Sequence, residues 1–188
     1  MRWTLLILGV TLAACGMSGG RQEPDRLPPR SQAMPIASAA ATPDARLLAF
    51  LNVANKGDYE GGRLAQSRAT SDAVKTYARQ METDHMRMLE DGERAARTLG
   101  IVPAIGPETQ PLVRDHEMAM DRLRMANDTD FDRTYMRHEV EMHRRVLQTA
   151  DAMATQVRDP ELKKLVENAR PILEAHLHAA EQLSGDIR

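Results

Sequence analysis

Three histidines lie where the spacing of apolar residues predicts the inner face of a helix. They are His85, His143 and His176. Around the first of them, Met81 and Met88 stand four residues before and three residues after it, which is the step of one helical face. Imidazole titrates near neutral pH and binds metal ions, so three imidazoles on apolar helix faces are the first candidates for a functional site.

Carboxylates accompany these histidines, but they match the two-metal pattern of helical bundles only in part. Such bundles take one Glu from each of two helices and a Glu-x-x-His pair from each of the other two. Glu82 stands three residues before His85 and supplies one such pair. The last helix has Leu173 in the corresponding place, and the third has Glu139, whose four-residue spacing to a histidine also shares a face. A single metal ion held by histidines and one carboxylate is therefore chemically easier than a two-metal centre.

The candidate metal ligands combine the three histidines with carboxylates of the first two helices. They are Glu60, Glu82, Asp84, His85, His143 and His176. At 1.5 Å per residue along their helices, these positions reach heights that agree to roughly 5–10 Å. The sequence therefore predicts one polar site at mid-bundle, for a divalent ion such as iron, zinc or copper.

Two other interpretations of the histidines stay open. Buried histidines can form a hydrogen-bond network that only specifies how helices pack, in a non-catalytic structural or protein-interaction module of the cell envelope. They can also belong to a redox enzyme, which the missing second Glu-x-x-His pair argues against. A ligand site predicts that the histidine side chains converge beside carboxylates. A structural network predicts that each ring bonds to backbone or hydroxyl groups of its own neighbours.

The rest of the composition argues against several other functions. The 12 methionines raise the question of a copper site, but most have core spacing, and Met fills gaps where aromatic residues are only 3% of the chain. A formal net charge of -2 provides no basic surface for nucleic acid. The sequence has no nucleophile motif, glycine-rich phosphate loop or nucleotide fingerprint. No enzyme activity is assigned from the sequence.

Four long helices and one short helix are expected to position the candidate residues. They are expected from Thr42 to about Ala69, from Ser71 to Gly100, from Leu112 to Met125, from about Asp130 to Val157 and from Asp159 to about Leu183. N-cap residues, first-turn prolines and a glycine suited to a left-handed C-terminus mark these limits. Pro171 lies inside the last helix and predicts a kink. The expected fold class is all-α, a four-helix bundle with an extra short crossover helix.

The N-terminus has the pattern of a bacterial lipoprotein signal. Arg2 precedes an apolar run from Trp3 to Leu12 that is too short to span a membrane as a helix. The run ends in Leu12-Ala13-Ala14-Cys15, which resembles a lipobox, so Cys15 is the expected lipidation site and membrane anchor. Gly16 follows in place of the Asp that usually retains lipoproteins in the inner membrane. We expect the periplasmic side of the cell envelope, at the outer membrane.

The chain thus divides into three expected parts. They are a signal peptide over residues 1–14, the lipidated cysteine with a disordered linker over residues 15–41, and the helical bundle over residues 42–188. The linker is rich in proline, glycine and small residues, a composition typical of a flexible tether.

A set of short motifs, in this order and spacing, resembles a known bacterial family. The motifs are Phe50-Leu51, Glu60 with Leu64-Ala65, Val74-Lys75 with Tyr77-Ala78, Met81 with Asp84-His85, Phe131-Asp132-Arg133 with Tyr135, Val140 with His143, Asp159-Pro160-Glu161-Leu162-Lys163, and Pro171 with Leu173 and His176-Leu177. The family is the domain of unknown function 4142, one of the ferritin-like bundles. The resemblance implies a ferritin-like four-helix bundle and an envelope location, and it implies little about activity.

Overall fold

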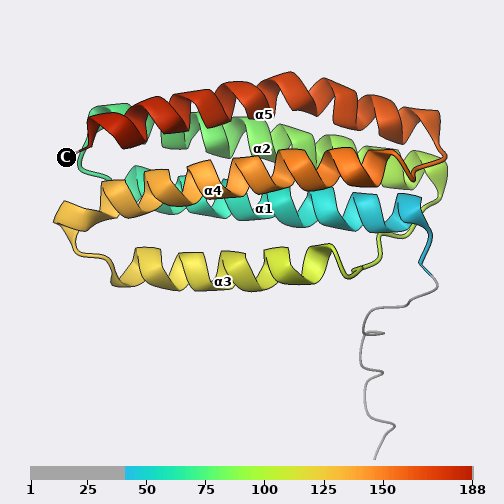
Figure 1. The fold of residues 1–188 in the computed structure, drawn as a ribbon, viewed down its shortest axis with the longest axis horizontal. Coiled ribbons are helices and arrows are strands. Elements are labelled where there is room, and N and C mark those ends of the chain that lie inside the picture. Colours follow the sequence, from blue (N-terminus) through green and yellow to red (C-terminus); the bar gives the residue numbers. More distant parts are fainter. Residues whose placement is uncertain (1–40, 188) are drawn as a thin grey trace, which may run out of the picture. The chain divides into compact units, whose positions relative to one another are not determined.

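The computed structural model describes residues 41–187 as a bundle of five helices (Figure 1). The helices are α1 Pro43–Arg68, α2 Asp72–Leu99, α3 Thr109–Met125, α4 Asp128–Ala154 and α5 Pro160–Asp186. The expected signal peptide, the lipidation at Cys15 and the linker lie outside the described residues. Within residues 41–187, no helix combines the length and the apolar character that a membrane span requires.

Local capping explains where most of these helices begin and end. The backbone N–H of Ala45 donates to Oγ1 of Thr42 at 3.2 Å, and Asp159 caps α5 ahead of its first-turn proline. Gly100 ends α2 with φ 65°, a left-handed conformation that costs glycine little. Two helix ends differ from those expected from the sequence. Helix α3 begins at Thr109, because Pro111 is tolerated in a first turn, and α4 ends at Ala154.

The cap expected from Ser71 does not form, and a side chain of another helix bonds the turn instead. The Ser71 side chain makes no capping bond to α2. Instead, Asp132 of α4 accepts from the backbone N–H groups of Thr70 and Ser71, at 3.0 and 2.8 Å, and from the Thr70 hydroxyl at 2.8 Å. A buried carboxylate on α4 therefore holds the turn between α1 and α2.

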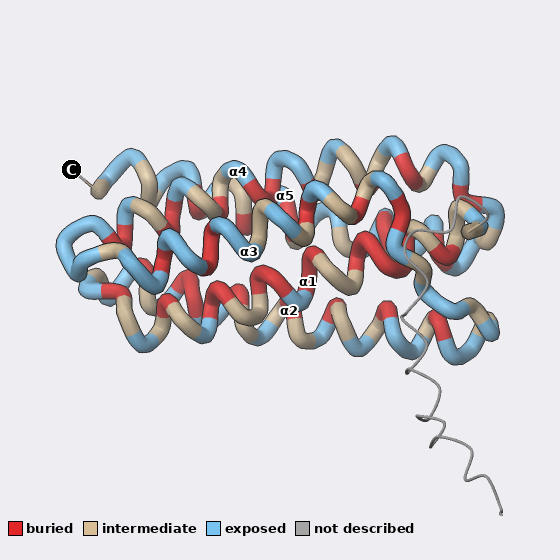
Figure 2. Tube along the Cα trace, turned by 90° about the horizontal axis from the view of Figure 1, so that it is seen from below, coloured by how far each residue is buried: buried red, intermediate tan, exposed pale blue. Residues whose placement is uncertain are grey.

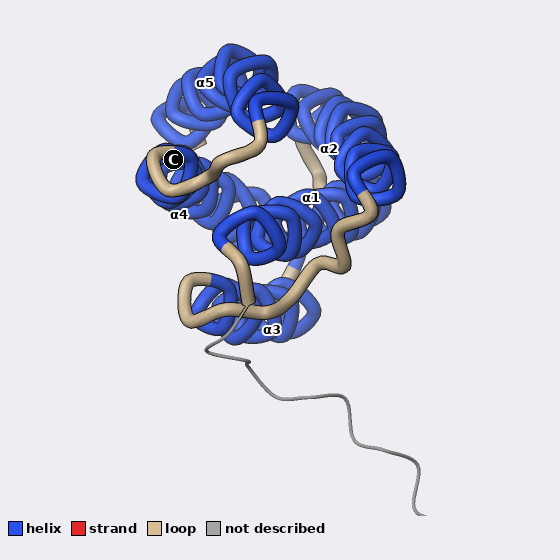
Figure 3. The backbone as a smooth tube through the Cα atoms, turned by 90° about the vertical axis from the view of Figure 1, so that its right-hand side faces the viewer, coloured by secondary structure: helices blue, strands red, loops and turns tan. Residues whose placement is uncertain are grey.

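The four long helices pack around a common core, and the short helix packs on the outside of this bundle. Helices α1 and α2 form one antiparallel hairpin and α4 and α5 form the other; α1 packs on α4, and α2 packs on α5 (Figures 1 and 3). Helix α3 crosses between the hairpins and packs against α1 and α4 (Figure 3). The predicted fold class, an all-α four-helix bundle with an extra short crossover helix, is confirmed.

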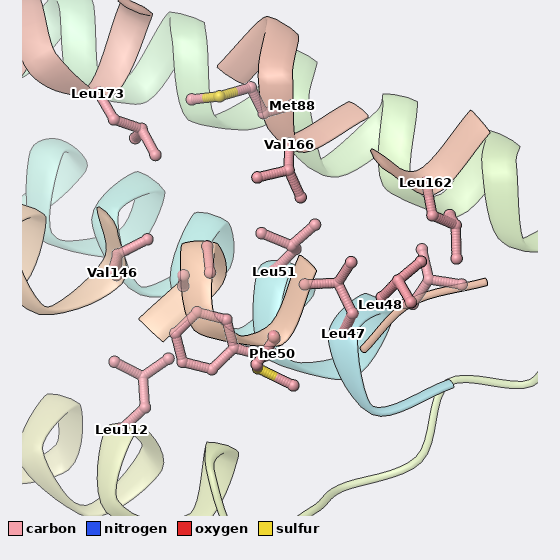
Figure 4. Packing of buried hydrophobic residues seen from close by; sticks show 14 of the residues in the cluster. Leu47, Leu48, Phe50, Leu51, Met88, Leu112, Val146, Leu162, Val166 and Leu173 are labelled. Carbon is pink, nitrogen blue, oxygen red and sulfur yellow. The ribbon is translucent and has the colours of Figure 1, made fainter. Parts of the chain in front are cut away.

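Buried residues lie on the inner faces of the helices (Figure 2). The apolar ones among them form two clusters. The first cluster joins α1 residues from Leu47 to Ala54 with parts of α2, α4 and α5, and Figure 4 shows its packing. The second lies towards the turn between α1 and α2. On α2 the clusters are separated between Met81 and Met88, and on α5 between Leu173 and Ala180. The candidate histidines of these two helices fall in that interval, as a polar layer between apolar cores.

Gly62 lies where α1 and α2 approach each other closely. A Cβ on Gly62 would lie 2.7 Å from the carbonyl oxygen of Ala78 on α2 and 3.0 Å from the backbone nitrogen of Glu82. Any larger residue would force the two helices apart. The glycine therefore permits the tight packing of α1 on α2.

Candidate metal centre

The three histidines meet at the centre of the bundle. His85 projects from α2, His143 from α4 and His176 from α5, and all are 0–1% exposed. Their ring centroids lie 5.3–5.5 Å apart, and each ring places one nitrogen within 4.8 Å of the others. The three rings thus form a nearly equilateral triangle between the two apolar clusters.

Two of the rings are oriented by a hydrogen bond at Nδ1. The Nδ1–H of His85 donates to Oδ1 of Asn55 on α1 at 3.0 Å. The Nδ1–H of His143 donates to the backbone carbonyl of Glu139, one helical turn earlier, at 2.9 Å. In both rings Nε2 is left as the basic nitrogen, and within residues 41–187 it has no hydrogen-bond partner.

The third ring is oriented from the opposite nitrogen. The Nε2–H of His176 donates to Oδ2 of Asp84 on α2 at 3.0 Å, which leaves Nδ1 of His176 without a partner in the described part of the chain. Asp84 is thus a partner of the ring and supports its orientation from outside the triangle. One nitrogen of each ring is bonded and the other has no partner among the described residues. Metal-binding histidines have this arrangement, because the group bonded to one nitrogen fixes the direction of the other.

Two buried carboxyl groups adjoin the triangle. Oδ2 of Asp58, on α1, lies 3.7 Å from Nε2 of His85, and Oε2 of Glu139 lies 3.5 Å from Nδ1 of His143. The hydroxyl of Tyr77 donates to Oε2 of Glu139 at 3.3 Å. The other oxygen of each carboxyl group has no hydrogen-bond partner among the described residues. All four bundle helices therefore supply polar groups to one layer.

Burial sets the protonation of this layer. It lowers the pKa of His85 well below its usual value, with the nearby His143 and His176 adding to the effect, and it lowers the pKa of His143 to about 3. Burial also raises the pKa of Asp58 to about 8 and that of Glu139 well above its usual range. At neutral pH the rings are neutral, which is the form that binds metal ions.

Two predicted ligands lie away from the triangle. Oε2 of Glu60 accepts from Nε2 of His116 at 3.3 Å, on the side of α1 that faces α3. Glu82 accepts from the side-chain amide of Gln66 and pairs with Arg63 at 3.7 Å. The structure thus brings the three histidines together and places Asp84 behind one of them, but it does not bring Glu60 or Glu82 to the cluster.

Two residues of the layer were missed in the sequence, and one of them had a detectable signal. Asp58 follows Leu47, Leu51 and Ala54 at steps of four, three and four, so it occupies the apolar face of α1. A charged residue in that position is as unusual as a histidine. Asn55 has no comparable signal, because an amide next to an apolar stripe is common at helix surfaces.

The methionines do not join the triangle. Met88, Met142 and Met153 pack in the first apolar cluster, and Met81 and Met136 pack in the second. These side chains fill core volume on either side of the polar layer. The oxygen next to the free nitrogen of His85 belongs to the carboxyl group of Asp58.

The geometry fits a metal ion after a small contraction. Around a tetrahedral ion with bonds of 2.0–2.1 Å, ligand atoms are about 3.4 Å apart. One nitrogen of each ring lies within 4.8 Å of a nitrogen of the other two rings, and the contact between Nε2 of His85 and Oδ2 of Asp58 is 3.7 Å. Three neutral imidazoles and a carboxylate suit borderline divalent ions such as zinc, iron or copper.

The fold and this layer define the class of the protein: an all-α bundle with a buried histidine and carboxylate cluster at its centre. The family model described as Domain of unknown function (DUF4142) matches residues 29–183. The chain belongs to this family, as its motifs indicated. Comparisons with curated proteins and with solved structures found no match.

Proposed function

We propose that the bundle binds one divalent metal ion between His85, His143 and His176, with Asp58 as the fourth ligand. The observation that carries this proposal is the convergence of three buried rings, each with one nitrogen within 4.8 Å of the others and one nitrogen without a hydrogen-bond partner among the described residues. Asp58 is the fourth ligand because its carboxylate lies beside the free nitrogen of His85. Glu139 is already engaged by the Tyr77 hydroxyl.

The unpaired atoms favour a ligand site over a purely structural network. A buried polar group without a partner costs about 1–3 kcal/mol, and native proteins carry few of them. Here three ring nitrogens and two carboxyl oxygens share one layer, within the residues that the structure describes, without hydrogen-bond partners of their own. A cation bound between the three rings and Asp58 compensates most of these groups at once.

The burial of the layer favours holding an ion over catalysis on a large substrate. The three rings are enclosed between two apolar clusters and reach almost no solvent. A molecule larger than water therefore cannot approach the bound ion without movement of a helix. We place this metal-binding bundle at the periplasmic side of the outer membrane, anchored by a lipid on Cys15, on the strength of the lipobox-like sequence.

The direct test is the metal content of the full chain, purified without a His tag, by elemental mass spectrometry. Wild type and a His178→Ala control, which alters an exposed histidine of α5, should each carry about one ion per chain after loading with zinc. The His85→Ala variant should carry none. Absence of bound metal from all three proteins would refute the proposal.

A structural hydrogen-bond network is the second candidate. It is favoured by the bond between the His143 ring and the backbone carbonyl of its own helix. In that case wild type melts at the same temperature with and without zinc, and His85→Ala is simply less stable. A metal site instead predicts a melting temperature of the wild type that rises with zinc concentration.

A further inference from the structure

A second group of ligand atoms lies next to the triangle. His138 of α4 places one ring nitrogen within 4.8 Å of carboxylate oxygens of Asp58 and Glu139. The two carboxyl groups are fully buried, and each has one oxygen without a partner in the described bundle. Asp58 therefore faces two sets of nitrogen donors: the free nitrogen of His85 on one side and His138 on the other.

His138 is the member of this group that reaches the surface. It lines a groove of about 620 Å³ between α3 and α4, whose other walls include Ala119, Leu123 and Thr134. It also lines a smaller cavity of about 190 Å³ beside Met142. The ring is partly exposed, whereas the three histidines of the triangle are buried.

We infer that Asp58, His138 and Glu139 form an outer cation site, through which a metal ion passes from the groove between α3 and α4 to the three histidines. This inference rests on the proposed function, since it names the route to that site. From the outside inwards, the ion meets a groove, one partly exposed imidazole, two buried carboxylates and three buried imidazoles. Each step replaces water ligands by protein ligands.

The charges around the groove are compatible with this route. Arg122 and Arg137 line the groove together with Asp130 and Glu141, so the formal charges of the lining balance. The lining itself neither attracts nor repels a cation strongly. Below His138, the carboxyl groups of Asp58 and Glu139 each offer one oxygen that has no hydrogen-bond partner among the described residues, and divalent cations accept such oxygen ligands.

The opposite side of the bundle offers a poorer route. Asp84, between α2 and α5, keeps 23% of its side chain exposed, but its carboxylate is bonded to His176 and lies 3.7 Å from the guanidinium of Arg87. An ion entering there would have to break the bond that orients a ligand and pass a cation. On the α3 side, the oxygens of Asp58 and Glu139 that have no partner among the described residues can bind an ion without the loss of such a bond.

The test compares the rates of zinc uptake and removal with the final affinity. Metal-free full chain is mixed with zinc, and loaded chain is mixed with a fluorescent zinc chelator in stopped flow. His138→Ala, and His138→Gln as a variant of similar size, should slow both processes at least tenfold by the same factor. The dissociation constant and the stoichiometry of one should stay as in wild type, because a residue on the path is absent from both end states.

The exposed His178→Ala variant is the control and should match wild type in every measurement. Unchanged rates in both His138 variants, while wild type still binds zinc, would overturn the route and leave the proposed function standing. Loss of binding in folded His138 variants would also overturn it, because His138 would then be a ligand of the final site. Absence of zinc binding in wild type would refute the site and the route together.

Discussion

The Nε2–H of His176 on α5 donates to Oδ2 of Asp84 on α2, at 3.0 Å. This bond crosses between the two hairpins and leaves Nδ1 as the nitrogen of His176 without a partner among the described residues. A carboxylate that was predicted as a ligand thus acts on the site through a histidine. Its role is to position the ring, and positioning partners of this kind contribute measurably to metal affinity.

Replacement of Asp84 should weaken zinc binding without abolishing it. Asp84→Ala removes the acceptor that orients His176, and we expect an affinity loss of about 10- to 100-fold. Asp84→Asn keeps an acceptor oxygen and should recover most of the loss. Isothermal titration calorimetry with the full chain checks both variants. Equal affinities for wild type and Asp84→Ala would show that the bond has no influence on the site.

The metal-free protein should lose stability as the pH rises above neutrality. The pKa of the Asp58 carboxyl is raised to about 8 in the folded state, so folding holds a proton there that the unfolded chain has already released. The stability that this carboxyl group contributes is complete below the pKa of Asp in the unfolded chain, near 4. It is lost progressively as the pH rises towards the folded-state pKa of about 8. Between pH 6.5 and 8 the loss from this group is about 2 kcal/mol, at 1.36 kcal/mol per pH unit.

Asp58→Asn isolates this effect, because an amide does not titrate. Urea unfolding of metal-free wild type and variant at pH 6.5 and pH 8 should show a smaller decline for the variant. The window is chosen because the buried histidines, whose pKa values are lowered, destabilise the fold only as pH falls below about 6.5. An identical decline in both proteins would contradict a protonated Asp58 in the folded state.

Gly62→Ala should destabilise the bundle, because the new methyl group would meet the carbonyl oxygen of Ala78 at 2.7 Å. We expect a loss of about 1–3 kcal/mol in the free energy of unfolding, the usual result of overpacking. Gly185→Ala is the matched control: it lies in α5 with open space around it, and it should raise stability by up to about 1 kcal/mol. The prediction fails if both variants are stabilised.

Asp132→Ala should destabilise the turn between α1 and α2. The substitution leaves the backbone N–H groups of Thr70 and Ser71 without their acceptor, and the expected loss is about 1–3 kcal/mol. Asp128→Ala, which alters an exposed carboxylate one turn earlier on the same helix, should have a much smaller effect. Hydrogen exchange at Ser71 provides a local measurement, and unchanged protection there would argue against this account.

The helices and the inward position of the histidines were determined by the sequence itself. Thr42, Asp159 and Gly100 act on their own helix ends through local backbone bonds, so their effect can be predicted from nearest neighbours. His85 lies on an apolar stripe whose period of 3.6 residues is equally local. The all-α fold class and the family follow from the same patterns.

Only the tertiary structure decided which carboxylates reach the histidines. Asp58 and Glu60 are two residues apart on α1, so they point about 200° apart around the helix axis, at 100° per residue. Asp58 faces the bundle, whereas Glu60 faces His116 on α3. Because α1 is covered on one side by the bundle and on the other by α3, both of its faces carry buried residues. The spacing of apolar residues predicts which residues share one face of α1. Which helix packs against that face, and therefore which partner a carboxylate on it meets, depends on the tertiary structure.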